Sequence, residues 1–504
     1  MKKRFNLRYQ SMASAILSFL CFFCNNLEVH SQALDIQWGQ AQPLPSKSEE
    51  IIKIVGEVPA GYIALQGKTS LFSMSGNNAL AILDKDKMRI LKSVPMDLKY
   101  EKEELTFQDI AMLDGQLYAF LSFYNAKKDK AFLFARNIDS ETLKFKGEYL
   151  KLGEVSQQNA MNLSLFSVSL SPDKSRLLVM SHLFFQRKEN KLVRLWVFDN
   201  HLAGLWQKEA TLSYQAEHLT LLQSLVDNEG NAYISTKYYQ KETSYHAFAF
   251  RQKGNDFSDQ EIAVKDKLVR ANWMSILPNG DMQFAGLYAD EKKEGVKGAF
   301  SFRQNPAKKN QDKLDIKPFD AGLLTSDLSE KKQAKAAAKG NEDEYCLNDY
   351  VARQLVSRPG GGSVLVTEQY YVERQDRAGT SMSYNTEHYG PLLVVAIDSN
   401  GQIGWAQKID KHQAWMTSYT LCTTPDALNF IYANAANESV VEHALYLTSI
   451  NNKGQMEKHT LLEGIRKKTE MDFKANISVQ MPNDEVLLFF SKRKEYVIGK
   501  LRLK

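Results

Sequence analysis

Short apolar runs separated by tight turns dominate the hydrophobic pattern of this chain. The clearest unit runs from Ser164 to Lys208. Its apolar runs occupy residues 165–170, 177–180, 193–198 and 204–206. Four short strands joined by tight turns form one antiparallel sheet, which cannot bury both of its faces alone. The pattern therefore predicts neighbouring sheets of the same kind elsewhere in the chain.

The turn between the first two strands of this unit recurs along the chain. Gly, Asn and Asp supply the positive φ that tight hairpins need, and Pro presets the entry into the turn. The recurring turns lie at 59–61, 113–115, 171–173, 227–230, 278–280, 359–361, 425–426 and 482–484. Most are 50–65 residues apart, which is the size of a propeller blade. We expect an all-β fold, a β-propeller of eight four-stranded blades, or seven if the first unit is irregular.

The last unit lacks one strand. Residues 476–480, 485–490 and 496–503 supply three, and residues 34–38 are apolar at alternate positions but belong to no complete unit. We expect the segment 34–38 to pair with 496–503, because such pairing closes the ring and removes exposed sheet edges.

One segment departs from the repeat. Residues 321–349 form an insertion in which Gln333 to Ala338 are strong helix formers. We expect Ser326 to cap this helix and Gly340 to end it. Three leucines are expected to hold the insertion against the propeller: Leu323, Leu324 and Leu328.

The first 33 residues have the pattern of a secretory signal peptide. A basic start precedes the apolar stretch Ala13–Cys24, and Ser31-Gln32-Ala33 is a small-x-small cleavage site. An uncleaved anchor is the alternative, but the apolar stretch is short for a bilayer. Cys21 and Cys24 lack the small preceding residue of a lipoprotein signal. We expect cleavage, export to the periplasm, outer membrane or exterior, and a propeller over 34–504 with no membrane-spanning segment.

Charge excludes one class of partner. The leader carries four basic residues and one acid, so its removal lowers the net formal charge from +5 to +2. A nucleic-acid-binding domain is usually clearly basic, so no nucleic acid is expected. Cys346 and Cys422 remain after cleavage. An exported protein often joins such a pair, but the strand map places them about 20 Å apart, too far for a disulfide bond.

Aromatic residues next to cations recur in the loop between the second and third strands. In a propeller, this loop lies on the face that usually binds partners, and such residues are good interface anchors or carbohydrate platforms. The alternative is that the aromatic residues pack between blades. The candidate partner-binding residues are Tyr124, Phe185, Tyr239, Tyr288, Tyr370, Tyr371, Arg374, Tyr384, His388 and Tyr389.

The sixth blade is the most elaborate. Its second strand leads into a long loop, and long loops in compact folds are commonly functional. With the upstream insertion, this loop is expected to form a raised wall on one side of the ring. Glu368 lies between apolar positions and is expected to be a buried acid paired with Arg353.

Enzyme motifs are missing from the sequence. No two histidines have metal-binding spacing, and Gly360-Gly361-Gly362-Ser363 fits a hairpin turn better than a nucleophile elbow. We expect no enzymatic activity, no metal and no cofactor.

Two segments resemble blades of the WD40-like and quinoprotein-like propeller superfamilies. In 197–206 and 396–405, an Asp-containing turn is followed by tryptophan, Trp206 and Trp405. The resemblance implies a propeller, with the tryptophans packed between blades. The vicinal cysteines of quinone-dependent dehydrogenases are missing, so the resemblance implies no quinone cofactor.

These observations favour a non-enzymatic scaffold that binds protein partners at the cell envelope, as a monomer or as a subunit of an envelope complex. Two alternatives remain open. One is a propeller that binds or cleaves carbohydrate; the other is an accessory subunit of an outer-membrane export or uptake complex.

Overall fold

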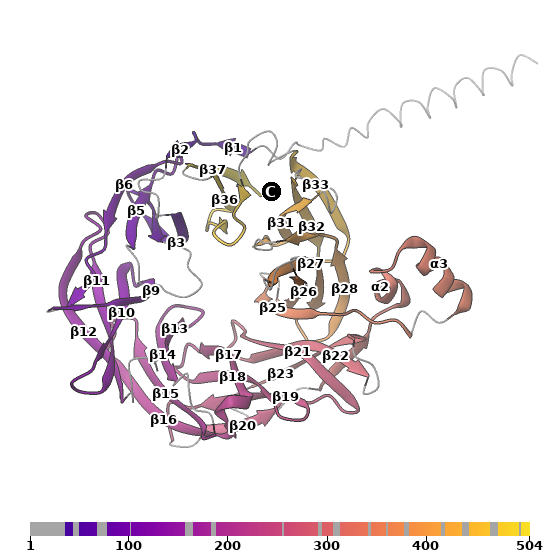
Figure 1. Cartoon of the computed structure of the whole chain (residues 1–504), viewed down its shortest axis with the longest axis horizontal. Coiled ribbons are helices and arrows are strands. Elements are labelled where there is room, and N and C mark those ends of the chain that lie inside the picture. Colours follow the sequence, from indigo (N-terminus) through magenta and orange to yellow (C-terminus); the bar gives the residue numbers. More distant parts are fainter. Residues whose placement is uncertain are drawn as a thin grey trace, which may run out of the picture.

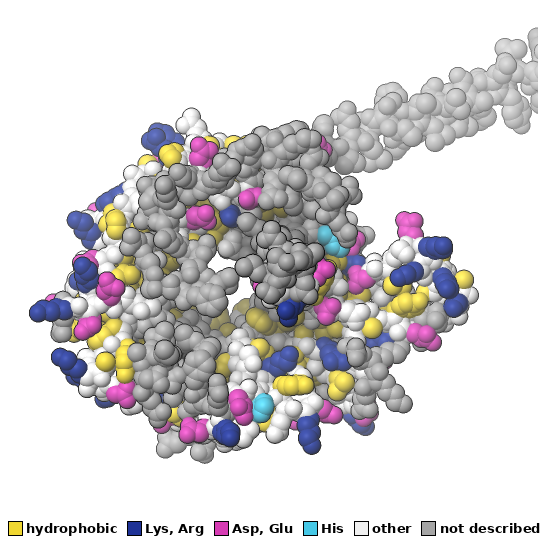
Figure 2. Space-filling view, in the orientation of Figure 1, with side chains coloured by type: hydrophobic (Ala, Val, Ile, Leu, Met, Phe, Trp, Pro, Cys, Tyr) yellow, Lys and Arg dark blue, Asp and Glu magenta, His cyan; other side chains and the backbone are white. Residues whose placement is uncertain are grey.

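The chain forms a ring of eight antiparallel sheets around an open centre (Figure 1). Figure 2 shows the same face as a surface that is hollowed in the middle, with acidic and basic side chains intermixed around it. The computed structural model describes residues 36–43, 50–67, 78–100, 102–156, 165–182, 188–254, 257–290, 295–305, 313–340, 344–358, 361–376, 383–414, 419–435, 443–463, 472–492 and 495–503.

The first four blades follow the predicted repeat, each with its first strand toward the centre of the ring. Blade 1 contains β3 (Glu50–Val58), β4 (Gly61–Gly67), β5 (Ala79–Leu83) and β6 (Ile90–Pro95). Blade 2 contains β9 (Thr106–Leu113), β10 (Gln116–Asn125), β11 (Lys130–Ile138) and β12 (Phe145–Ser156). Blade 3 contains β13 (Leu165–Leu170), β14 (Arg176–His182), β15 (Asn190–Asp199) and β16 (Gly204–Gln215). Blade 4 contains β17 (Leu219–Val226), β18 (Ala232–Tyr239), β19 (Thr243–Phe250) and β20 (Phe257–Glu261).

The next three blades repeat this order. Blade 5 contains β21 (Lys267–Ile276), β22 (Met282–Asp290), β23 (Gly298–Gln304) and β24 (Asp315–Pro318). Blade 6 contains β25 (Tyr350–Ser357), β26 (Ser363–Asp376), β27 (Ser383–Ile397) and β28 (Ile403–Ile409), and β29 (Gln413–Ala414) pairs with β27. Blade 7 contains β30 (Thr420–Thr423), β31 (Ala427–Ala435), β32 (His443–Asn451) and β33 (Met456–Leu462). A small hairpin, β7 (Lys99–Tyr100) and β8 (Glu103–Glu104), links blades 1 and 2, and a 3₁₀ turn (Ala216–His218) links blades 3 and 4.

Both ends of the propeller meet in blade 8. From the C-terminal part come β34 (Asp472–Phe473), β35 (Val479–Gln480), β36 (Glu485–Lys492) and β37 (Glu495–Arg502). From the N-terminal part come β1 (Ile36–Trp38) and β2 (Gln42–Pro43), which pair antiparallel with β37. Ile36 lies opposite Leu501 and is buried with it in one apolar cluster. The predicted closure of the ring is confirmed, and so is the count of eight blades.

The hydrophobic core is divided among the contacts between blades. Each of eight apolar clusters in the described residues combines side chains from two neighbouring blades. The middle strands contribute most because both of their faces are covered: β4 and β5 are buried along their whole length. A blade therefore stabilises the fold only together with its neighbours.

The two tryptophans of the repeat connect successive blades, as the sequence predicted. Trp206 of blade 3 donates its indole N–H to the carbonyl of Gly230 in blade 4, at 2.7 Å. Trp405 of blade 6 donates to the carbonyl of Asn452 in blade 7, at 3.2 Å. A Cβ atom at Gly454 would lie 2.8 Å from the Trp405 ring, so glycine is needed there for close packing.

The insertion contains two helices, α2 (Ala321–Thr325) and α3 (Glu330–Lys339), on the outer circumference of the ring beside β28 (Figure 1). Gly340 ends α3 with a φ of 62°, as expected. The predicted cap was wrong: Ser329 precedes α3, whereas Ser326 ends α2. These helices lie at the periphery of the ring, whereas the tip of the sixth-blade loop, residues 377–382, lies outside the described residues, so the raised wall stays a prediction.

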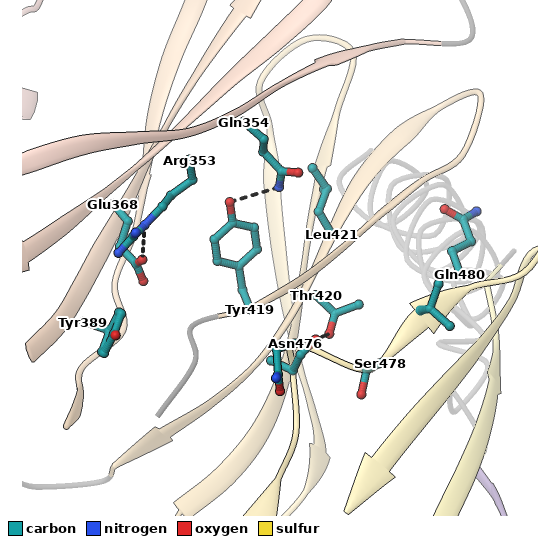
Figure 3. A pocket seen from close by; sticks show the side chains of 12 residues that line it. Arg353, Gln354, Glu368, Tyr389, Tyr419, Thr420, Leu421, Asn476, Ser478 and Gln480 are labelled. Atoms are coloured by element: carbon teal, nitrogen blue, oxygen red, sulfur yellow. Dashed lines mark hydrogen bonds and ion pairs between the residues drawn. The ribbon is translucent and has the colours of Figure 1, made fainter. Parts of the chain in front are cut away.

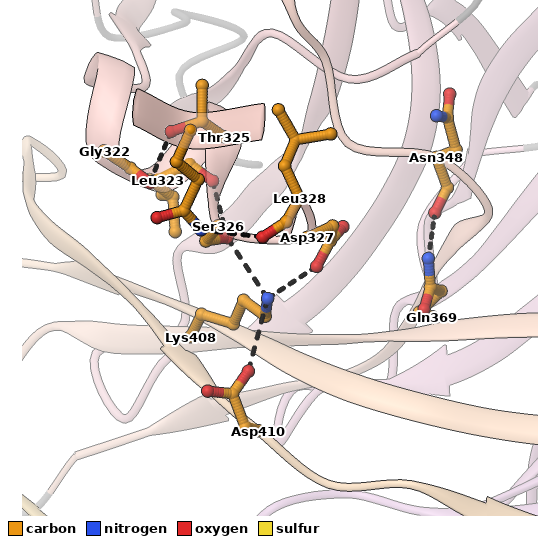
Figure 4. Close-up of polar contacts among 11 residues, drawn as sticks. Gly322, Leu323, Thr325, Ser326, Asp327, Leu328, Asn348, Gln369, Lys408 and Asp410 are labelled. Atoms are coloured by element: carbon orange, nitrogen blue, oxygen red, sulfur yellow. Dashed lines mark hydrogen bonds and ion pairs between the residues drawn. The ribbon is translucent and has the colours of Figure 1, made fainter. Parts of the chain in front are cut away.

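The insertion is attached through apolar and polar contacts. Leu324 is buried and Leu323 packs against the same cluster between blades 5 and 6, as expected, while Leu328 is half-buried. Lys408 of β28 contacts Ser326 and Asp327 in the segment between the helices (Figure 4). In the described residues, no helix combines the length and apolar character needed to span a bilayer.

Cys346 and Cys422, the two cysteines in the described part of the chain, are both free thiols. Cys422 is fully buried between blades 7 and 8, and this burial raises the pKa of its thiol to about 12. Cys346 is half-buried in the insertion, 3.8 Å from the Asn348 side-chain oxygen. The expectation that the two thiols stay apart is confirmed.

Candidate functional site

The β26–β27 pair of blade 6 extends further than any other strand pair in the described part of the chain, with strands of 14 and 15 residues. We call residues 370–376 with 383–389 the blade-6 hairpin. Tyr371 and Val372 are 43% and 49% exposed on it. The Tyr371 ring stacks on His388 across the strands, with centroids 4.6 Å apart and planes 9° from parallel. This pairing holds an aromatic surface rigid in solvent.

A second aromatic pair lies at the base of this hairpin. The rings of Tyr370 and Tyr389 are 5.2 Å apart, and both hydroxyls donate to Glu387, at 3.1 and 2.9 Å. Desolvation, followed by the Glu387 hydrogen bond, raises the pKa of Tyr370 and that of Tyr389, the latter to about 12. Both rings also lie next to the Arg353 guanidinium, at 5.3 and 5.7 Å, so the pair connects the hairpin to a buried charge cluster.

Arg353, Glu368 and Lys411 form that cluster. Arg353 Nε donates to Glu368 Oε2 at 2.7 Å, which confirms the predicted pair. Lys411 Nζ lies 2.7 Å from Glu368 Oε1, and both of these side chains are fully buried. Desolvation lowers the pKa of Lys411, and the neighbouring carboxylate opposes that shift. A cationic side chain therefore contacts each oxygen of Glu368.

Two irregularities in the strand pairing place these residues. The register of β25 against β26 shifts between Ala352 and Gln354, and Arg353 is the extra residue. The register of β26 against β27 shifts between Glu368 and Tyr370. Bulges of this kind redirect side chains and are frequent at binding sites.

The charge cluster borders a pocket of about 630 Å³ that is lined by residues of blades 6, 7 and 8 (Figure 3). This volume is typical of a small-ligand site. Half of the lining residues lie on the first strands of the three blades. The full lining is Arg353, Gln354, Glu368, Tyr389, Tyr419, Thr420, Leu421, Ala475, Asn476, Ser478, Val479 and Gln480. Gln354 donates to the Tyr419 hydroxyl at 3.0 Å, and burial raises the pKa of Tyr419.

The structure brings together four of the predicted partner-binding residues whose side chains are described: Tyr370, Tyr371, His388 and Tyr389. Arg374 lies further along the exposed edge of the same hairpin. Tyr384 belongs to β27, but its side chain lies outside the described residues, as does all of Phe185.

Three other predicted residues lie on separate blades. Tyr239 is 59% exposed at the end of β18. Tyr124 is the last residue but one of β10 and donates to Asp129 at 2.7 Å. The prediction of a partner-binding role was wrong for Tyr288, which is only 3% exposed and packs in the core between blades 4 and 5. For Tyr288, the alternative of packing between blades holds.

Sequence reasoning missed Lys411 and Tyr419. Lys411 follows β28 in the polar stretch 410–413, where nothing in the local pattern distinguishes it from a solvated lysine. Tyr419 precedes a short first strand whose position the sequence did not fix. Both enter the site only through contacts between residues distant in the chain.

A Ser–His–Asp arrangement also escaped sequence reasoning. His246 Nε2 lies 3.0 Å from Ser244 Oγ, and His246 Nδ1 lies 3.2 Å from Asp259 Oδ1. However, Tyr214 bonds to both His246 Nδ1 and Asp259, at 2.9 and 2.8 Å. Ser244 lies within a paired strand and not at the strained turn that exposes a nucleophile. The network therefore fits a connection between blades 3 and 4.

Within the residues that the structure describes, no cluster of three His, Cys, Asp or Glu side chains has the geometry to hold a metal ion. No protein-family model matches the chain, and no curated protein matches it in sequence.

Several solved propellers are similar to this chain in structure. The Dos1 propeller is 10% identical with a TM-score of 0.43, and the match covers 93% of this chain and 96% of that one. The WD40 domain of SCAP from fission yeast is 7% identical with a TM-score of 0.40, covering 93% and 97%. The propeller domain of the Trilobed protease from Pyrococcus furiosus is 10% identical with a TM-score of 0.38, covering 83% and 97%. These similarities are too distant to carry an argument about function, and the fold itself follows from the strand pairing.

Proposed function

We propose that this propeller is a non-enzymatic scaffold that binds a protein partner through the blade-6 hairpin. The ring supplies a rigid support, since each blade is packed against two neighbours. The hairpin rises from the face that carries the blade-to-blade connections, where propellers usually bind partners. In this role the protein binds its partner at the cell envelope and catalyses no reaction.

One observation carries the proposal: Tyr371 and Val372 are both exposed, one on each face of a hairpin whose conformation is fixed. Tyr371 stacks on His388, and His388 Nε2 lies 3.2 Å from Glu373 Oε2. Rigid aromatic residues lose little conformational entropy on binding and are enriched among the residues that dominate interfaces. The surrounding polar side chains, Glu373 and Arg374, suit the rim of such an interface.

The charge cluster favours binding over catalysis. A general acid must bring its carboxyl group within hydrogen-bonding reach of the substrate. The Glu368 side chain is fully buried, and both of its oxygens already contact cationic side chains at 2.7 Å.

Affinity capture from the native envelope tests the proposal. The variant Tyr371→Ser with Val372→Thr removes the apolar surface and keeps strand-compatible side chains. We expect it to lose the captured partner at least tenfold. The matched control is Met456→Thr, which removes an equally exposed apolar side chain (46%) on β33 of blade 7.

Unchanged capture by the double variant would contradict the proposal. Cleavage of a glycan by the wild-type protein would replace it with the carbohydrate-active alternative. Copurification with an outer-membrane export or uptake complex, lost in the double variant, would identify the partner class within the same proposal.

Export is part of the proposal and rests on the leader-like pattern of residues 1–33. Cleavage after Ala33 would leave β1, which begins at Ile36, available to complete blade 8. N-terminal sequencing of protein purified from the native envelope should then begin at Leu34. A chain that retains Met1 in the cytoplasm would contradict export.

A further inference from the structure

The pocket beside the blade-6 hairpin is bordered by an uneven set of charges. Arg353 and Lys411 both face one carboxylate, that of Glu368. Two cations on one anion leave a formal excess of one positive charge where Glu368 and Lys411 are fully buried. Arg353, whose side chain is 33% exposed, carries this excess toward the pocket and attracts a negatively charged group.

Two hydrogen-bond donors of the pocket have no acceptor among the described residues. Arg353 uses Nε on Glu368, but its Nη2 atom is buried and makes no hydrogen bond. The Tyr419 hydroxyl accepts from Gln354, and its own hydrogen has no acceptor in the described part of the chain. Unsatisfied buried polar groups are few in native proteins, and each needs an explanation such as strain, a catalytic role, or a bound water or ion.

The other polar side chains of the pocket are already used by the protein. Gln480 both donates to and accepts from the backbone of Thr423. Ser478 donates to Lys474 and accepts from Phe489. Thr420 donates to the Ala475 carbonyl. Few polar groups thus remain for a polyhydroxylated sugar ring, whereas a carboxylate needs only a few donors.

Besides Asn476, the remaining lining of the pocket on blades 7 and 8 is aliphatic. Leu421, Val479 and Ala475 provide aliphatic surface. Tyr389 lines the pocket and also pairs with Tyr370 at the hairpin base. A protein segment bound along the hairpin would therefore be led into the pocket end first.

We infer that the pocket binds the C-terminal carboxylate of a protein segment, with Arg353 Nη2 and the Tyr419 hydroxyl as donors and an apolar last side chain against Leu421 and Val479. This inference rests on the proposed function, because it names the part of the partner that the scaffold recognises. Arginine suits this task because its planar guanidinium presents several donors to a carboxylate at once.

Two short peptides test the inference on the full chain. The probes are acetyl-Gly-Gly-Leu with a free carboxylate and the same peptide amidated, with binding measured by ligand-observed NMR. We expect the free acid to bind at least tenfold more tightly than the amide. Arg353→Lys keeps the charge but removes the guanidinium donors and should weaken acid binding at least fivefold. Arg194→Lys, in another arginine–glutamate pair on blade 3, should leave it unchanged.

Tyr419→Phe removes one hydroxyl and no ring, so it tests the same site even if Arg353→Lys does not fold. It should weaken binding of the acid severalfold and leave the amide unaffected. Equal binding of acid and amide, or no binding of either, would overturn the inference. So would selective binding of an oligoglucuronate in place of the peptide.

Partner capture separates this inference from the proposed function. If Tyr371→Ser with Val372→Thr abolishes capture while Arg353→Lys and Tyr419→Phe do not, the pocket inference fails and the scaffold proposal stands. If the peptide acid binds the pocket but no variant affects capture, the scaffold proposal fails and the pocket site stands.

Discussion

At the scale of single residues, the propeller holds a histidine in the uncharged state. His182 ends β14, and its Nδ1 atom is buried without a hydrogen-bond partner among the described residues. Burial, followed by the positive charge of Lys191, lowers the pKa of His182 to about 4. In the unfolded chain a histidine titrates near pH 6.5, so folding and proton binding oppose each other between these two values.

The low pKa of His182 predicts that the folded protein is sensitive to acid. When folding depresses the pKa of a histidine, the free energy of unfolding does not depend on that histidine above its unfolded pKa. It falls as the pH drops from the unfolded pKa to the folded pKa, because the unfolded chain then binds a proton that the folded chain does not. The stability of the protein should therefore decrease from pH 6.5 to pH 4, with roughly 2.5 kcal/mol of the loss due to His182. In His182→Leu, the free energy of unfolding from urea titrations should change by about that amount less than in the wild type between pH 6.5 and pH 4.

His201 provides the control. It is exposed in the turn after β15, so His201→Asn should leave the pH profile of the wild type in place. If His182→Leu retained the full acid sensitivity, other groups would have to account for it, and the buried neutral state of His182 would be excluded as a cause.

The surroundings of individual side chains could be predicted from the sequence only in part. Glu368 was predictable because an acid between apolar strand positions is forced inward and needs a cation, and Arg353 lies one strand away at a compatible register. Lys411 was not predictable, since it reaches Glu368 from beyond β28 and its neighbours in sequence are polar. Tyr288 was misassigned because exposure at a strand end depends on the neighbouring blade.

At the scale of elements, the helical insertion depends on one lysine of the propeller. Lys408 on β28 is nearly buried and contacts Ser326 Oγ at 3.2 Å and Asp327 Oδ1 at 2.5 Å (Figure 4). It also lies 3.2 Å from Asp410 Oδ1. A single cation thus connects an outer strand of blade 6 to the segment between α2 and α3.

We predict that Lys408→Met loosens the insertion without unfolding the ring. Methionine keeps the aliphatic packing of lysine but cannot bind Asp327, so α2 and α3 should open more often. Limited trypsin digestion at the lysines of α3 should become severalfold faster. The urea midpoint of the propeller should change little, because the eight clusters between blades keep their apolar contacts.

Lys335→Met is the matched control, since Lys335 lies on α3 itself and is exposed. It removes one trypsin site without touching Lys408. Equal digestion of Lys408→Met and the wild type would show that Leu323 and Leu324 alone hold the insertion.

The elements themselves were predictable where local chemistry decides. The hairpin turns and the stop at Gly340 follow from residues that tolerate positive φ. The start of the helix was not predictable from Ser326 and Ser329 alone. The choice depends on the short helix α2, which is capped by Asp320 and ends at Ser326, whose hydroxyl donates to Leu323.

At the scale of the whole molecule, the ring closes by joining segments more than 450 residues apart in sequence, for example through the Tyr496 hydroxyl and Gln42. The repeat could be predicted because each blade has its own turn chemistry, and closure could be predicted because blade 8 lacked a strand. The pocket could not be predicted, since it depends on how blades 6, 7 and 8 are placed around the channel.

Closure gives the last prediction. Ile36 is the only buried residue of β1 and packs with Val497 and Leu501 in the cluster between blades 7 and 8. Ile36→Ala should cost about 2–4 kcal/mol, as for other truncations of buried aliphatic side chains. Gln37→Ala, one position along on the exposed face of the same strand, should cost less than about 0.5 kcal/mol. Urea unfolding midpoints measure the effects of both substitutions.

Because each blade is stabilised by contacts with its neighbours, the loss of stability in Ile36→Ala should appear in all blades together. An effect confined to blade 8, or equal midpoints for the two variants, would show that the ring does not depend on this strand.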